Sequence, residues 1–257
     1  MIDIHCHILP GVDDGASSLT ESLAMARAAE KEGIQKIIAT PHHQNGAFMN
    51  NGADIIGVVD YLNGKIQEEQ IAVQILPGQE TRIYGDMLAD LKNGDVLPLN
   101  ETSGYVFVEL PASHVPEYST QLLFDMQIAG YKPIIVHPER NLELMDNPDK
   151  LYRIVKNGAL TQITAASVIG KSGKKIEKFT RQLLEANLTH FIASDAHHSK
   201  KRSFHMRAAY QDIKKEHGND LVYQLMENSE ALVNGFAVQM DAPERVSTRK
   251  MWGLFSR

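Results

Sequence analysis

Short apolar runs alternate along the chain with longer stretches in which apolar residues recur every three or four positions. Short runs bounded by Gly or Pro are typical of buried strands, and the longer spacing is typical of helices that pack on one side. The pattern predicts seven strands, at residues 2–7, 34–39, 71–76, 105–108, 133–136, 159–164 and 191–194. Strands that alternate with helices indicate an α/β fold with a parallel sheet, either closed into a barrel or wound open.

The first predicted helix illustrates the local signals. Ser18-Leu19-Thr20-Glu21 matches a capping box, in which Ser18 begins the helix, and Gly33 is expected to end it. The 3–4 spacing predicts that its buried stripe contains Leu19, Leu23, Ala26 and Ala29. Five further helices are expected in the intervals between the later strands, around residues 55–66, 84–91, 117–129, 148–158 and 173–187.

Six of the seven predicted strands carry His, Asp or Glu at or just beyond their carboxyl ends. Parallel strands bring these ends to one face, where the active sites of β/α barrels lie. Imidazole and carboxylate ligands without a thiolate suit manganese, iron or zinc, and less well magnesium alone. The number of candidates exceeds the need of one ion, so two or three metal ions are predicted. The candidates are His5, His7, His42, His43, Glu80, Glu109, His137, Asp195, His197 and His198.

The opening strand contains His5-Cys6-His7. Successive strand residues point to opposite faces, so His5 and His7 are expected on one face and Cys6 on the other. Cys6 is therefore interpreted as a small core residue. A thiolate phosphatase would also need Arg six positions after the cysteine, and position 12 is Val.

Composition limits the class of protein. The 257 residues are 43% hydrophobic and 23% charged, which fits one soluble domain, residues 1–257, with a basic and aromatic tail at about 245–257. A formal net charge of −6 disfavours nucleic-acid binding, and no apolar run predicts stable membrane insertion. A single cysteine agrees with a reducing, cytoplasmic location.

The motifs together resemble the polymerase and histidinol phosphatase (PHP) family, and within it the bacterial CpsB/CapC-type tyrosine-protein phosphatases of capsule and exopolysaccharide systems. The resemblance rests on the opening His-Cys-His-Ile-Leu-Pro-Gly-Val-Asp-Asp-Gly, on Pro-Glu-Arg at 138–140 and on the other strand-end residues up to His197. It implies a distorted (β/α)7 TIM-like barrel with a trinuclear, often manganese-dependent site.

By the same resemblance, the metal ligands divide into three sets. His5, His7, Glu80 and Asp195 would hold one ion, and Glu80 would bridge to a second ion held by Glu109 and His137. Asp14, His42 and His197 would hold the third ion.

The implied reaction is hydrolysis of phosphotyrosine by a metal-activated hydroxide. Arg140, just beyond His137, is expected to bind the phosphate with its guanidinium fork. Arg207 is a second candidate that the family suggests. His43 and His198 are either outer ligands, proton donors or loop histidines without a role.

The resemblance implies that the substrate is the tyrosine-rich tail of a membrane-associated bacterial tyrosine kinase. Three alternatives remain at this point: a small-molecule phosphatase of histidinol-phosphate type, a metal-dependent nuclease and a non-catalytic metal-binding regulator. Lys200-Lys201-Arg202 could attract an acidic phosphopeptide, although a charge run is more often a solvated surface.

Overall fold

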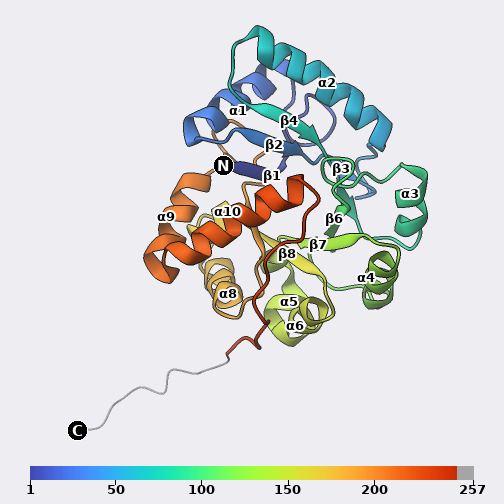
Figure 1. Ribbon diagram of the computed structural model, residues 1–257, viewed down its shortest axis with the longest axis vertical. Helices are drawn as coiled ribbons and strands as arrows, with labels where there is room; N and C mark the ends of the chain where they lie inside the picture. Colours follow the sequence, from blue (N-terminus) through green and yellow to red (C-terminus); the bar gives the residue numbers. More distant parts are fainter. Residues whose placement is uncertain (248–257) are drawn as a thin grey trace.

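The computed structural model describes residues 1–247 and consists of parallel strands surrounded by helices (Figure 1). The strands are β1 Ile2–Cys6, β2 Lys36–Ala39, β3 His42–His43, β4 Gln74–Pro77, β5 Glu80–Arg82, β6 Tyr105–Glu109, β7 Lys132–Val136, β8 Leu160–Thr164 and β9 Phe191–Ala193. The helices are α1 Leu19–Glu32, α2 Gly52–Glu68, α3 Met87–Asn93, α4 Ser119–Ile128, α5 Leu142–Asp146, α6 Pro148–Lys156, α7 Ala165–Val168, α8 Lys174–Glu185, α9 Met206–His217 and α10 Asn219–Val233, with a 3₁₀ turn η1 at Pro138–Arg140.

All strand pairs are parallel, which confirms the predicted α/β class. The pairing order is β1-β2-β4 in one sheet and β3-β5-β6-β7-β8-β9 in the other. The first and last strands also meet, because the Asp195 N–H donates to the His5 carbonyl at 2.9 Å and the His7 N–H donates to the Ala196 carbonyl at 2.9 Å.

Two predicted strands are each followed, after a short break, by a second short strand that the sequence analysis did not predict. β2 ends before Thr40-Pro41 and resumes as β3, and β4 ends before Gly78-Gln79 and resumes as β5. Gly78 permits the second break, since a Cβ there would lie 2.5 Å from Cγ2 of Ile38. The two resumed segments pair with each other through His42 and Glu80, so the breaks set the direction of two candidate ligands.

The first helix begins and ends as predicted. The Ser18 hydroxyl accepts a bond from the Glu21 N–H, and Gly33 closes the helix with φ of 83°. Glu21 does not complete the capping box, because its carboxylate instead accepts the N–H of Ser199, in the loop between β9 and α9. The buried stripe is shifted from the predicted one: Ser22, Met25, Ala26 and Ala29 are buried, whereas Leu19 and Leu23 are partly exposed.

The core has two layers. The inner cluster includes Ile4, Phe107 and Phe191 from the strands and is extended by Leu232 of α10. A larger cluster fills the space between the strands and the surrounding helices. Since α10 contributes to the inner cluster beside Tyr105, the first residue of β6, it covers the amino-terminal ends of the strands and leaves the carboxyl ends free for a site.

The apolar and aromatic residues of the predicted tail, Met251, Trp252, Leu254 and Phe255, lie outside the described residues. The described part of that tail is fixed to α6, because the Arg245 guanidinium pairs with Asp149 and lies 4.8 Å from the centre of the Tyr152 ring. None of the described helices is long and apolar enough to cross a lipid bilayer.

Candidate metal centre

The nine predicted metal ligands converge at the carboxyl ends of the strands, and Glu80 lies at their centre. Its Oε2 atom is 3.4 Å from Nε2 of His5 and 3.3 Å from Nε2 of His7. The same oxygen is 2.9 Å from Nδ1 of His42, and Oε1 is 2.7 Å from Nε2 of His137. Glu80 is fully buried, so its carboxylate depends on these four imidazoles.

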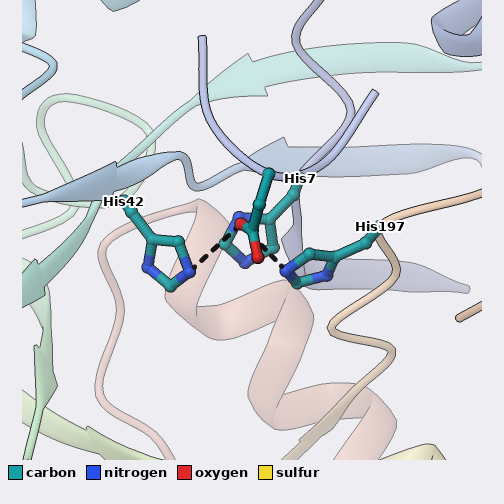
Figure 2. Close-up of side chains that lie close together, drawn as sticks. His7, His42 and His197 are labelled. Atoms are coloured by element: carbon teal, nitrogen blue, oxygen red, sulfur yellow. Dashed lines mark ion pairs between the residues drawn. The ribbon is translucent and has the colours of Figure 1, made fainter. Parts of the chain in front are cut away.

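A second group forms beside it. The imidazoles of His7, His42 and His197 point toward one another (Figure 2). Oδ1 of Asp14 lies 3.5 Å from Nε2 of His42 and 3.4 Å from Nε2 of His197. Asp195 completes the centre on the other side, with Oδ1 at 3.3 Å from Nε2 of His7.

The side chains form three overlapping groups. Within each group, every residue offers one potential ligand atom, and these atoms all lie within 4.8 Å of one another. The groups are His7-Asp14-His42-His197, His5-His7-Glu80 and His42-Glu80-Glu109. The grouping that the family implies pairs Glu109 with His137, whereas the present geometry also brings His42 to Glu109, at 3.9 Å. His137 reaches the centre through Glu80.

Unsatisfied buried atoms show that these residues suit a metal. Nδ1 of His42, Oε2 of Glu80 and Nε2 of His197 are buried and form no hydrogen bond of acceptable geometry. Two of them, His42 Nδ1 and Glu80 Oε2, are only 2.9 Å apart, so the absence of a hydrogen bond between them is due to its geometry and not to their distance. Their lone pairs are directed at shared space, which is how ligands of one cation are arranged.

The pKa shifts of the clustered residues also agree with a metal site. Burial by itself would raise the pKa of the Glu80 carboxyl, but His5 and His42 outweigh it and hold that pKa well below its usual range. Burial also opposes ionisation of Asp195, and Arg140 together with His7 nevertheless lowers its pKa strongly. Burial would lower the pKa of His7, yet Asp13 raises it well above its usual value. The two carboxyl groups are therefore ionised, and His7 carries a proton at a position that a divalent cation would take.

Outer residues orient the ligands. Nδ1 of His7 bonds Oδ2 of Asp13 at 2.7 Å, and Nδ1 of His5 bonds Oε1 of Gln162 at 2.8 Å. Each contact leaves Nε2 of the histidine facing the centre, an arrangement typical of metal sites. The sequence analysis missed both partners, and it assigned no ligand function to β8, from which Gln162 comes.

Glu109 is held by a residue that the sequence analysis also missed. Arg82, on the neighbouring strand β5, donates Nε and Nη2 to the two Glu109 oxygens, each at 2.9 Å. This bidentate pair fixes the carboxylate plane.

Two ligands occupy a backbone conformation that is rare outside glycine. His137, directly after β7, has φ of 34°, and Asp195, two residues after β9, has φ of 53°. The left-handed region costs free energy for residues with a Cβ. At these two positions the turn directs the side chain across the strand ends.

Two arginines flank the centre. Arg140 donates Nη1 to Oδ2 of Asp195 at 2.5 Å and Nη2 to the Thr164 hydroxyl at 3.1 Å. Arg202 donates Nη2 to the same Asp195 oxygen at 3.2 Å. The predicted Arg207 is not brought to the centre, because its Nη2 donates to the Lys31 carbonyl at the end of α1. Arg202, five residues earlier, supplies the second guanidinium.

Cys6 lies behind the ligands. Its side chain is fully buried and its Sγ lies 3.6 Å from the Ala196 carbonyl oxygen, in line with the predicted core role. Burial and nearby carboxylates raise the pKa of the thiol well above its usual value, so a thiolate is disfavoured. His43 is also buried, but neither ring nitrogen has a hydrogen-bond partner, and it belongs to none of the three metal-ligand groups.

The family model described as "Capsular polysaccharide synthesis, CpsB/CapC" matches residues 1–234. The chain belongs to this family. The tyrosine-protein phosphatase YwqE of Bacillus subtilis is 48% identical over 99% of this chain and 100% of its own length. The putative tyrosine-protein phosphatase CapC of Staphylococcus aureus is 33% identical over 98% of both chains.

Solved structures agree with this membership. A crystal structure from the pair YwqE of Bacillus subtilis and CpsB of Streptococcus pneumoniae, described as unique metal-dependent tyrosine phosphatases, matches with a TM-score of 0.94. That match has 48% identity and covers 96% of this chain and 100% of the other. Histidinol phosphate phosphatase from Lactococcus lactis, at 14% identity and TM-score 0.52, covers 92% of this chain and 95% of its own and shares the TIM-like fold alone.

Proposed function

We propose that this chain is a metal-dependent protein-tyrosine phosphatase that needs two or three ions, with manganese as the native metal. The observation that carries the proposal is a set of seven side chains in three overlapping metal-ligand groups, adjoined by His137 and Asp195, with two guanidinium groups beside it. Bound divalent ions would supply an activated water nucleophile and neutralise phosphate charge.

The chain's own residues would bind and orient the phosphate. Arg140 is held in place from both sides, by Asp195 and by Thr164, whose hydroxyl also contacts Glu139 at 3.0 Å. A guanidinium fixed in this way needs little rearrangement to donate two parallel bonds to phosphoryl oxygens. Arg202 is about half exposed and approaches the same carboxylate from the solvent side.

The exposure of the residues gives a direction of entry. His5, His7 and Glu80 are buried, whereas Asp14 and Arg202 remain about half exposed. The ions would therefore lie below an opening lined by Asp14 and the two arginines. A phosphate on the long tyrosine side chain can reach such a depth more readily than one on serine, which supports tyrosine as the phosphorylated residue.

The proposed substrate is the phosphorylated tyrosine-rich tail of a membrane-associated bacterial tyrosine kinase that controls capsule or exopolysaccharide synthesis. Support comes from the family's link to capsular polysaccharide synthesis and from relatives named tyrosine-protein phosphatases. Such a tail would be met in the cytoplasm, where the single buried thiol of Cys6 would stay reduced.

One assay set tests the proposal. Protein freed of metal by chelation and then reloaded with manganese, iron, zinc or magnesium is given a phosphotyrosine peptide, the matched phosphoserine peptide and histidinol phosphate. The expected result is hydrolysis of the phosphotyrosine peptide that chelation abolishes and manganese restores. Equal rates on the two peptides would show a general phosphatase without preference for phosphotyrosine. Preference for histidinol phosphate would favour the small-molecule alternative.

A further inference from the structure

A cavity lies beside the metal centre, between the chain that follows α7 and the loop that joins β9 to α9. Its volume is about 260 Å³, and it shares Arg140, Asp195 and Arg202 with the centre. The far side is lined by Lys171, Ser172 and Lys201, together with His205. The cavity therefore continues from the place proposed for the phosphate toward a separate group of cationic and hydroxyl side chains.

The charge of this cavity is unbalanced. Asp195 is the single carboxylate among its lining residues in the described chain, and Arg140 and Arg202 already pair with it. Within residues 1–247, neither Lys171 nor Lys201 has a carboxylate oxygen within 4 Å of its ammonium group. Two lysines from different loops thus face one cavity without an anion of their own.

The pKa of His205, which also lines the cavity, is affected by the positive charge of Lys171. Burial lowers the pKa of its imidazole, and the charge of Lys171 lowers it further, although Glu32 acts in the opposite direction. The His205 backbone has φ of 54°, a conformation that few residues with a Cβ adopt. A ring held in this strained turn lines the cavity as a neutral hydrogen-bonding group.

We propose that this cavity is a binding subsite for an anionic side chain, a carboxylate or a second phosphate, that neighbours the phosphotyrosine in the substrate. Lys171 and Lys201 would pair with the anion while Arg140 holds the phosphate that is cleaved. The proposal rests on the proposed phosphatase function and adds a preference to it: acidic sequences around the tyrosine are hydrolysed with a lower KM.

Three phosphotyrosine peptides test the subsite. They differ only in the residues that flank the tyrosine, which are glutamine, glutamate or phosphoserine on both sides. The manganese-loaded wild type should hydrolyse the glutamate and phosphoserine peptides with a KM at least fivefold below that of the glutamine peptide, at similar kcat. The glutamate and phosphoserine arms separate a carboxylate from a second phosphate as the preferred anion.

The variants Lys171→Ala and Lys201→Ala should each remove most of this preference, and the double variant should remove all of it. Hydrolysis of p-nitrophenyl phosphate, which has no flanking group, should be unchanged. Lys200→Ala is the matched control, because Lys200 has the same charge and lies next to Lys201 but does not line the cavity. Equal KM values for the three peptides in the wild type, or an equal loss in Lys200→Ala, would overturn the subsite.

A binding measurement separates this proposal from the proposed function. The same peptides with non-hydrolysable phosphonomethyl-phenylalanine in place of phosphotyrosine are titrated against the metal-loaded protein by fluorescence anisotropy. Preference for the anionic peptides that depends on Lys171 and Lys201 would support the subsite even if no peptide were hydrolysed, an outcome that would refute only the phosphatase. Absence of any preference in this measurement would refute the subsite alone.

Discussion

At the scale of single residues, the alternation of side chains along β1 places the two candidate ligands His5 and His7 on one face and the thiol of Cys6 on the other. Nε2 of His5 and Nε2 of His7 lie 3.3 Å apart, while Cys6 between them is buried against Ala196. Residues that are consecutive in sequence therefore have opposite environments. This difference gives the first prediction.

Cys6→Ser should keep most of the phosphatase activity, apart from a modest loss of stability from placing a hydroxyl in an apolar position. His7→Ala should lose activity and bound metal together, because a missing ligand weakens the hold on the ions. Phosphatase rate measured alongside metal content for the two variants checks this. A folded, fully metallated but inactive Cys6→Ser protein would show that the thiol takes part in the reaction.

The second prediction concerns the guanidinium groups. Removing a group that stabilises charge in the transition state typically costs about 10²–10³ in kcat. Arg140→Ala should therefore lose activity on this scale without losing metal, and Arg202→Ala should lose activity as well. Arg207→Ala is the matched control and should retain near-normal kcat, since its guanidinium binds the end of α1. Normal turnover by Arg140→Ala would remove this residue from the mechanism.

At the scale of elements, the loop after β1 is shaped by a glycine that approaches the backbone closely. A Cβ on Gly15 would lie 2.1 Å from the His7 carbonyl oxygen and 2.5 Å from the His7 Cβ. The loop also closes on itself, because the Ala16 N–H donates to the His7 carbonyl at 3.0 Å. The loop that presents Asp13 and Asp14 is therefore packed directly on a ligand.

Gly15→Ala should displace this loop and lower both metal affinity and activity, with about 1–3 kcal/mol lost from the free energy of unfolding. Gly57→Ala is the control, because no atom lies within 4 Å of a Cβ there and alanine is favoured inside a helix. Chemical denaturation and metal titration of the two variants measure the effects. Gly15→Ala with normal metal affinity would show that the loop tolerates the extra methyl group.

The contact between β8 and β9 contains a histidine that should make stability depend on pH. Burial lowers the pKa of His190 from 6.5 to about 4, and its Nδ1 accepts the Thr161 N–H at 3.1 Å. The folded state thus binds this proton more weakly than the unfolded chain. The stabilisation is complete above pH 6.5 and is lost as the pH falls toward 4, by up to about 3 kcal/mol.

His190→Asn keeps an acceptor near the Nδ1 position and removes the titrating group. The difference in unfolding free energy between wild type and variant, measured from pH 7 to pH 4, should shift in favour of the variant as the pH falls. Asp3, whose pKa burial raises to about 6, titrates with the opposite sign in both proteins and cancels in the difference. A difference that does not change with pH would contradict the burial of a neutral His190.

At the scale of the whole molecule, the alternation of parallel strands with helices and the placement of the candidate ligands near the strand ends could be predicted from the sequence, because both follow from short local patterns. The partners from distant strands could not. Gln162 lies in a strand that the pattern predicts without a ligand, and its pairing with His5 spans 157 residues. Arg202 lies in the loop after β9, where its carbonyl accepts the His197 N–H at 2.9 Å, whereas Arg207 lies in α9, and the sequence pattern did not distinguish the two.

The same convergence of strand ends predicts that metal ions hold the fold together. The candidate ligands come from segments between His5 and His197, and without ions they place mostly buried carboxylates and imidazoles close together. A ligand that binds only the folded state at 1,000 times its Kd adds about 4 kcal/mol to the free energy of unfolding. Chelation should therefore lower Tm by several degrees, and added manganese should restore it. His7→Ala should show a smaller shift than the wild type, and Lys200→Ala should show the full shift. Equal Tm with and without metal in the wild type, measured by scanning calorimetry, would show that these side chains hold no ion that contributes to stability.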